Sequence, residues 1–183
     1  METPQRRRFD IIVEGRNPGK GSKMPPFMNR RTGRIVLVEE NAAEKKAWER
    51  RAVAALKELL PPGQQPWRGP VFIAVILYYA RPANQYTGNN RVTGKLRDDA
   101  PQFARTGRPD GDKAMRLVWD AVTKAGVIAD DVLVSYWGGQ KRWSDNGKTY
   151  THVTVILMDD DDYPEAAEDL DSLIRFIEEE KQK

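Results

Sequence analysis

The sequence predicts an α+β fold, in which a single domain with one mixed β-sheet packs with two helices and is followed by an acidic C-terminal helix. The 183 residues suit one domain of ordinary size. Hydrophobic residues make up 39% of the chain, which is enough for one core, and 31% of the residues are charged. Two amphipathic helical patterns lie among short runs of β-branched and aromatic residues, which is typical of this fold class.

In the first half of the chain, residues 9–13 (FDIIV) predict a first strand, and a flexible, basic segment follows it. Residues 30–38 predict a turn and a second strand. Residues 41–60 form the clearest helical pattern, which Pro61-Pro62-Gly63 ends. The apolar positions of this helix are Ala47, Trp48, Val53, Ala54, Leu56 and Leu60. Residues 71–80 (VFIAVILYYA) predict a buried central strand.

In the second half, residues 82–108 form a long basic loop, and a loop of this length within a domain is usually functional or disordered. Residues 113–125 predict a second helix that ends at Gly126. Its apolar stripe consists of Leu117, Val118, Ala121, Val122 and Ala125. Residues 132–137 and 152–158 predict two strands joined as an antiparallel hairpin. Residues 164–183 predict the acidic helix, with Leu170, Leu173, Ile174 and Ile177 as its apolar stripe.

The composition excludes several kinds of chemistry. Cysteine is absent, which rules out disulfides, thiolate metal sites and a cysteine nucleophile. His152 is the only histidine, so histidine-rich metal sites and histidine-dependent triads are not expected, and His152 itself is expected to be structural. A metal would therefore be held by carboxylates, which favours Mg²⁺, with Mn²⁺ as an alternative. No apolar run is long enough to span a membrane, and the first residues lack the apolar segment of a secretion signal.

The charge is distributed unevenly along the chain. Residues 1–158 contain 27 Lys and Arg against 16 Asp and Glu, whereas residues 159–183 contain 3 against 11. A basic body with an acidic extension is typical of proteins that bind polyanions. The alternative is a surface that is basic only for solubility. The division at residue 158 predicts a main domain, 1–158, and an acidic extension, 159–183.

Four aspartates flank the second predicted helix. Asp110 and Asp112 stand two residues apart in a turn before it, and Asp130 and Asp131 follow its end. Clustered carboxylates repel one another, and a divalent cation relieves this repulsion and can polarise a phosphate oxygen. Structural alternatives remain open, because an Asp before a helix is often its N-cap and a pair of Asp residues beside a strand is often part of a turn.

The residues around these acids resemble the RusA family of phage and prophage Holliday-junction resolvases. The family pattern is roughly P-D-x-D-N-x-x-K-x-x-x-D-A-L, followed by A-G, D-D and a strand with a lysine. The residues in register are Pro109, Asp110, Asp112, Asp120, Ala121, Ala125, Gly126, Asp130, Asp131 and Lys141. The match is specific over about 35 residues, and the element order agrees from about residue 9 to residue 158.

The resemblance implies a RusA-like domain and an endonuclease that cuts opposed strands of a four-way DNA junction in recombination and repair. Asp110, Asp112 and Asp131 would be the essential acids that bind Mg²⁺, and Asp130 a weaker candidate ligand. The resemblance also implies a homodimer in the cytoplasm of a bacterial or phage-infected cell. A C2 dimer would present two active sites to the junction. The basic residues expected to contact DNA are Arg105, Arg108, Lys113, Lys141 and Arg142.

Two positions depart from the family pattern. Lys113 stands where Asn is usual, and Arg116 stands where the family has a catalytic lysine. Arg116 can neutralise charge on a phosphate but cannot donate a proton at neutral pH, and it could instead pair with Asp112 or Asp120. The departures leave two alternatives open, a catalytically impaired junction- or branched-DNA-binding protein and a general nucleic-acid-binding protein. Trp137, Trp143 and Tyr150 could pack beside sugars or bases, or in the core.

Overall fold

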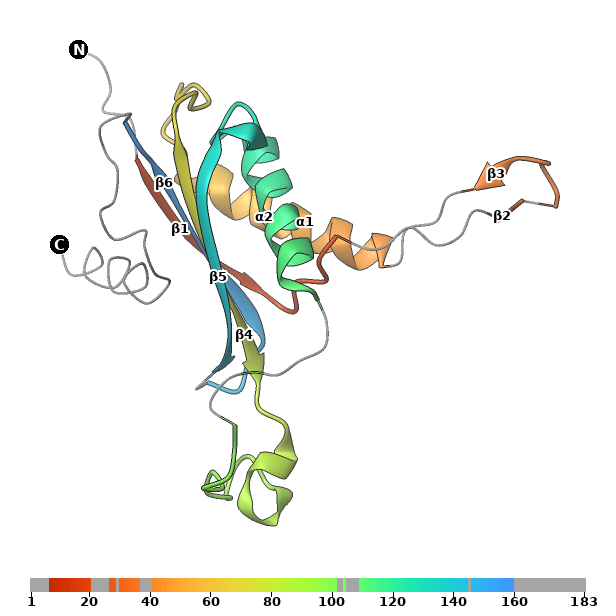
Figure 1. The fold of residues 1–183 in the computed structure, drawn as a ribbon, viewed down its shortest axis with the longest axis vertical. Helices are drawn as coiled ribbons and strands as arrows, with labels where there is room; N and C mark the ends of the chain where they lie inside the picture. The colour runs from red at the N-terminus through yellow and green to blue at the C-terminus, as the bar shows by residue number, and fades with distance from the viewer. Residues whose placement is uncertain are drawn as a thin grey trace.

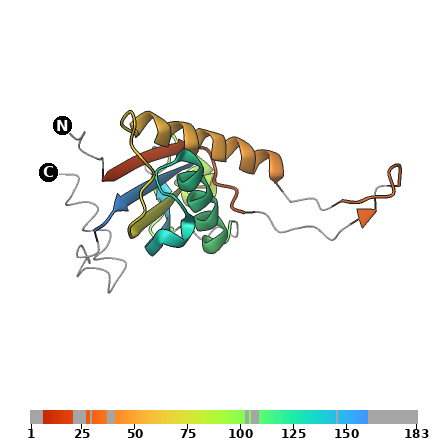
Figure 2. The same cartoon turned by 90° about the horizontal axis from the view of Figure 1, so that it is seen from above.

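The computed structural model describes residues 7–20, 27–28, 30–36, 41–101, 104, 109–144 and 146–159. A four-stranded sheet has the strand order β1-β6-β4-β5, and the helices α1 and α2 pack together on one of its faces (Figures 1 and 2). The predicted class, a mixed sheet packed with two helices, is confirmed. The predicted helix 164–183 lies outside the described residues. Within the described residues, no helix is long and apolar enough to cross a membrane.

The strand β4 (Val71–Ala80) is an interior strand of the sheet, as its apolar sequence predicts. It pairs antiparallel with β6 (Tyr150–Leu157), which in turn pairs antiparallel with β1 (Arg8–Glu14). On its other side β4 pairs parallel with β5 (Val134–Ser144), which is an edge strand. The carboxyl ends of β4 and β5 therefore meet at the same edge of the sheet.

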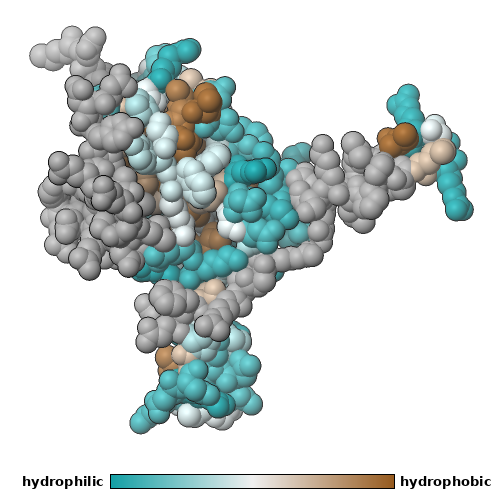
Figure 3. Space-filling model, viewed as in Figure 1, coloured by the Kyte–Doolittle hydropathy of each residue, from teal (hydrophilic) through white to brown (hydrophobic). Residues whose placement is uncertain are grey.

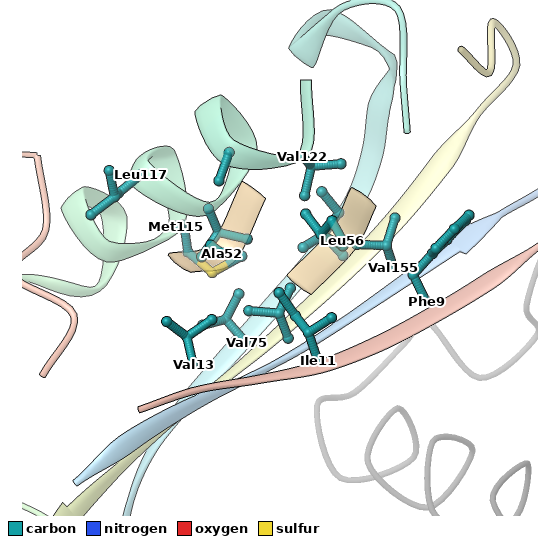
Figure 4. Close-up of a cluster of buried hydrophobic side chains, with 14 of the residues drawn as sticks. Phe9, Ile11, Val13, Ala52, Leu56, Val75, Met115, Leu117, Val122 and Val155 are labelled. Carbon is teal, nitrogen blue, oxygen red and sulfur yellow. The ribbon is translucent and has the colours of Figure 1, made fainter. Parts of the chain in front are cut away.

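The core lies between the sheet and the two helices (Figure 4). The helix α1 (Ala42–Leu59) buries Trp48, Ala52 and Leu56, whereas Ala54, predicted on its apolar stripe, is exposed. The helix α2 (Gly111–Ala125) buries every residue of its predicted stripe, which are Leu117, Val118, Ala121, Val122 and Ala125. Gly126 ends α2 with a φ of 81°, a left-handed conformation that glycine adopts readily.

The predicted antiparallel hairpin of residues 132–137 and 152–158 is wrong. The strand β4 lies between β5 and β6, so these two strands, which follow each other in sequence, are not hydrogen-bonded to each other. The strand β5 also continues through Ser144, across Gly138 and Gly139, which the sequence placed in a loop. The apolar strand β4 lies between β5 and β6 because the backbone of a buried strand needs a hydrogen-bonded neighbour on each side.

Two segments project from this body. Residues 82–101 form the irregular loop that the sequence predicts, with short 3₁₀ turns at Ala83–Gln85 and Thr87–Asn89, and hydrophilic residues dominate its surface (Figure 3). The strands β2 (Phe27–Met28) and β3 (Ile35–Val36) form a separate small hairpin, which extends away from the sheet in both ribbon views. The predicted turn and second strand are thus confirmed in the described part of residues 30–38.

The sheet face opposite the helices carries a polar network around Asp10. Its carboxylate accepts hydrogen bonds from Arg8 Nε at 2.7 Å and from Thr154 Oγ1 at 2.7 Å, and His152 Nε2 lies 3.5 Å away. Partial burial alone would raise the pKa of Asp10, but the contacts with His152, Arg8 and Thr154 outweigh burial and hold this pKa well below its usual range. The single histidine thus takes part in a structural network, in agreement with the sequence prediction.

Candidate active site

The first turn of α2 presents two acids to solvent. Asp110 is the N-cap residue, with an extended backbone, but its side chain makes no capping hydrogen bond. The carboxylate instead forms an ion pair with Lys113, with 2.9 Å between Lys113 Nζ and Asp110 Oδ2. Asp112 is exposed in the same turn. The N-cap alternative therefore holds for the backbone position of Asp110 but does not explain its carboxylate.

A segment before the second strand supports this turn. The side chain of Asn17 is buried and donates a hydrogen bond to the Ala114 carbonyl at 3.4 Å. The backbone N–H of Lys20 donates to the Lys113 carbonyl at 2.9 Å, and Lys20 Nζ lies 3.0 Å from a carboxylate oxygen of Asp120. The sequence pattern suggested a flexible segment here, but residues 17–20 are held against the start of α2. An Asn-Pro-Gly turn was the available signal, and it indicates a turn without showing what it contacts.

A glycine permits the close approach of this segment. Gly19 has a φ of 70°, and a Cβ built on it would lie 2.7 Å from the Cβ of Pro109, directly before the acidic turn. No other residue fits this contact without a shift of the chain. The position of Asp110 therefore depends partly on a glycine some 90 residues earlier in the chain, which sequence reasoning did not identify.

A cavity of about 270 Å³ opens between the start of α2 and the edge strand β5. Asp112 and Met115 line it from the helix, and Trp137 and Lys141 line it from β5. Lys141 is paired in register with Leu77, a core residue of β4, which places Lys141 on the helix-covered face of the sheet. Asp112 and Lys141 thus border one cavity, although 29 residues separate them in the sequence.

Arg142 lies on the opposite face of the sheet, because successive side chains of a strand point to opposite sides. It is paired in register with Tyr78, and its Nε donates to Gln140 Oε1 at 2.7 Å. The structure therefore brings only one of the two neighbouring basic residues, Lys141, to the cavity beside Asp112. Arg105 and Arg108, also predicted to contact DNA, lie outside the described residues.

The three candidate aromatic residues occupy different environments. Trp137 is 56% exposed and meets Trp119 of α2 edge to face, with ring centroids 5.9 Å apart. Trp143 is partly buried and donates its indole N–H to the Pro101 carbonyl at 2.9 Å. Tyr150 stacks on Tyr78. Of the three, Trp137 is the aromatic residue that lines the cavity beside Asp112.

Asp130 and Asp131 lie beyond the opposite end of α2. Asp130 accepts a hydrogen bond from the backbone N–H of Val132 at 3.0 Å, as the turn alternative predicts, and Asp131 begins the short 3₁₀ helix Asp131–Leu133. The 15 residues of α2 separate them from Asp110 and Asp112, which corresponds to about 22 Å of helix. Among the described residues, no three acidic or histidine side chains gather closely enough to hold one metal ion.

Arg116 follows Asp112 by one helical turn and is exposed. Its predicted alternative partners are not engaged with it, because the carboxylate of Asp120 pairs with Lys20 and no ion pair joins Arg116 to Asp112 in the described part of the chain. The guanidinium therefore remains available to an anionic ligand that approaches the first turns of α2.

The paired acids fit a divalent cation that prefers oxygen ligands. Asp110 and Asp112 lie in one exposed turn, and Mg²⁺ is commonly held by one or two carboxylates together with water and a phosphate of the substrate. Lys113 occupies one oxygen of Asp110 in the structure, so a cation at Asp110 would have to displace this ammonium. Asp112 has no such ion pair within the described residues.

The chain matches one known protein family over most of its length. The family model described as Endodeoxyribonuclease RusA matches residues 18–155, which is well over half of the chain. The match places the protein among the endodeoxyribonucleases, which cut phosphodiester bonds within DNA. The chain belongs to the RusA family, whose activity is the resolution of Holliday junctions. A comparison with curated proteins found no significant match.

Proposed function

We propose that this protein resolves four-way DNA junctions in recombination and repair by Mg²⁺-dependent phosphodiester hydrolysis, with Mn²⁺ as an alternative cation. The observation that carries the proposal is the pair of exposed carboxylates, Asp110 and Asp112, at the start of α2, where Asp112 borders one cavity together with Lys141. The loop 82–101, which carries Arg91 and Lys95, leaves the sheet at the carboxyl end of β4, the end at which Lys141 also lies. Acids for a metal and bases for phosphates thus share one end of the molecule.

The predicted site residues each have a role in the proposed reaction. Asp110 and Asp112 would hold Mg²⁺, which would supply polarisation of a phosphate oxygen and a lowered pKa of a coordinated water. Lys141 attracts the phosphate from the β5 side, and Arg116 stabilises its charge from α2. Arg116 acts only through charge, because its guanidinium remains protonated at neutral pH. Lys113, Arg105, Arg108 and Arg142 contribute to binding the phosphates of the junction arms.

We further propose that the protein acts as a C2 homodimer in which each active site draws on both copies. The separation of about 22 Å along α2 prevents Asp131 from sharing a metal ion with Asp112 of the same chain. Asp131 and the weaker candidate Asp130 are exposed, so a second copy can bring them to the first turn of α2. Two such sites would cut two opposed strands, as resolution requires.

Cleavage of a synthetic four-way junction with and without Mg²⁺ tests the proposal. Asp112→Asn should abolish cleavage and retain junction binding, because it removes a metal ligand and also a negative charge that faces phosphate. Glu58→Gln is the matched control, since it removes an exposed acid of α1 that lies outside the proposed site and has no ion pair among the described residues. Near wild-type cleavage by the Asp112→Asn variant would remove Asp112 from the mechanism.

A second candidate is a junction-binding protein with impaired catalysis. It is favoured by the contact between Lys113 Nζ and Asp110, which places an ammonium where a metal ion would bind. Under this alternative the wild-type protein binds the junction and does not cut it at any Mg²⁺ concentration. Lys113→Asn, which restores the residue usual in the family pattern, would then gain cleavage because the Asp110 carboxylate is released.

A further inference from the structure

We propose that the cavity between α2 and β5 binds one unstacked nucleobase of the nucleotide next to the cleaved bond. The proposal rests on the proposed function and extends it, because a base held in this cavity would influence which sequence is cut. The cavity is bordered by Asp112 and Lys141, so a base inside it would adjoin the phosphate at the proposed metal site. The chemistry of its wall, the exposure of its aromatic residue and its size support this occupant.

The wall of the cavity is apolar below its rim. Val75 and Leu77 of β4 and Met115 of α2 line it, and each of these residues is at least 95% buried. A phosphate would lose its hydration here without gaining hydrogen bonds, so the cavity interior does not suit the DNA backbone. A nucleobase is the flat and least strongly hydrated part of DNA, and apolar and aromatic side chains stack on it irrespective of its identity.

Trp137 provides an aromatic surface at the rim. Its indole is 56% exposed, although it lines the cavity and lies on the helix-covered face of β5. Trp119 contacts it edge to face, with an angle of 71° between the rings, and this contact fixes the orientation of the Trp137 ring while leaving exposed area for a ligand. Ligand pockets are lined mainly by apolar and aromatic side chains, and the Trp137 ring beside this apolar cavity fits that pattern.

Gly139 keeps the cavity open on the β5 side. It is paired in register with Val75, and a Cβ built on it would meet the Val75 carbonyl oxygen at 3.1 Å and Met115 Sδ at 3.4 Å. Any larger side chain at this position would therefore extend into the space between Trp137 and Lys141. The volume of about 270 Å³ lies just below the range of about 300–1,000 Å³ that drug-sized ligands occupy, which suits one ring system rather than a dinucleotide.

The polar residues lie where the phosphate of the same nucleotide would be. Lys141 attracts an anion at the rim, and Asp112 would help to hold a metal ion that offsets its own negative charge beside that anion. The base would thus enter the apolar space while its phosphate stays at the rim. Extrusion of a base costs stacking and pairing energy, and the stacking part is smallest where the strands of a junction exchange, because the continuous stack of base pairs can be interrupted there.

A double-mutant cycle between protein and DNA tests the inference. Affinities are measured in Ca²⁺, which should support binding with little cutting, for junctions that carry either a base or an abasic site at each nucleotide flanking the cut. For each protein, the affinity for the junction with a base is divided by the affinity for the junction with an abasic site at the same position. At one position this ratio should be roughly 5- to 100-fold larger for the wild type than for Trp137→Ala, which is the scale of one base stacked on an aromatic ring. Gly139→Leu should lose the same discrimination, because its side chain fills the cavity.

Ile12→Ala is the matched control, since it shortens a side chain that is 62% exposed on the opposite face of the sheet and should leave the discrimination unchanged. If Gly139→Leu does not fold, the smaller Gly139→Ala change and Trp137→Ala carry the test. Binding of the junction with equal base discrimination by wild type and Trp137→Ala at every position would overturn this inference and leave the proposed function intact. Failure of the wild-type protein to bind any junction would overturn both.

Discussion

The sharpest test of the shared active site uses a dimer in which each copy carries a different substitution. One copy carries Asp112→Asn and the other carries Asp131→Asn, and two different affinity tags allow the mixed dimer to be purified. If Asp112 of one copy and Asp131 of the other form one site, the mixed dimer has one site with both acids intact and one site with neither. If each site lies within one copy, both sites lack an acid.

The expected magnitude follows from the length of α2. About 22 Å of helix separates the two acids in one copy, whereas a carboxylate oxygen lies only about 2.0–2.6 Å from the Mg²⁺ or Ca²⁺ that it binds. A site within one chain is therefore excluded for this acid pair without a large rearrangement of the fold. The mixed dimer should cut at about half the wild-type rate, because one of two symmetric sites remains. It should also cut one strand of the junction and not the opposed strand.

A supercoiled plasmid that extrudes a cruciform provides the assay, since a single cut gives the open circle and paired cuts give the linear form. The mixed dimer should accumulate open circles, whereas the wild-type protein gives linear plasmid. The control is a mixed dimer of Asp110→Asn and Asp112→Asn, which has no intact site if both acids come from one copy. Activity of the Asp112/Asp131 dimer no greater than that of the control would refute the shared site, as would a protein that is monomeric on the junction.

Three further outcomes are expected. Arg116→Ala should slow junction cleavage by roughly 10²-fold, the scale of losing one preorganised donor, while Arg116→Lys retains much of the rate. Normal turnover by the alanine variant would show that Arg116 is a surface residue without a role in the reaction. Asp10→Asn should lower the unfolding free energy at pH 7 by about 1–2 kcal/mol, less than a fully buried charged hydrogen bond because the Asp10 side chain is 33% exposed. Since the pKa of Asp10 is depressed in the folded state, this stability is present above about pH 4 and is lost as the pH falls further, so urea titrations of wild type and variant should converge in acid. Deletion of residues 164–183 from the acidic extension should tighten DNA binding, most strongly at about 50 mM salt, and an equal affinity for a folded truncation would show that the extension does not compete with DNA.

The elements that the sequence predicted correctly are those whose evidence is local. Every residue of the predicted stripe of α2 is buried, because the residues on one face of a helix are fixed by their spacing alone. The apolar run of β4 predicted an interior strand for the same reason. In α1, by contrast, Ala54 was predicted to face the core, but Ala54 is exposed and Ala52 is buried. Two alanines have the same hydrophobicity, so their side chains do not reveal which of them faces the core.

The arrangement of the acids was only half predictable. Asp110 and Asp112 share one turn because they stand two residues apart, and the spacing gave this directly. Whether Asp131 could join them depended on where the chain returns after α2, and the strand that follows runs back along the helix from the far end. The support of the site by Asn17 and Gly19 is also non-local, because nothing in their own sequence shows that they contact α2.

The element that the sequence predicted least well is also the one that carries the cavity. Residues 138–142 (GGQKR) have low strand propensity, and they form a strand because parallel pairing with β4 supplies their hydrogen bonds. Alternation along this edge strand then directs Trp137 and Lys141 to the helix-covered face and leaves Gly139 between them without a side chain. A more apolar strand would have filled the space beside α2 with core residues. The small and polar residues that made β5 hard to predict as a strand are thus the same residues that leave room for a ligand beside Asp112.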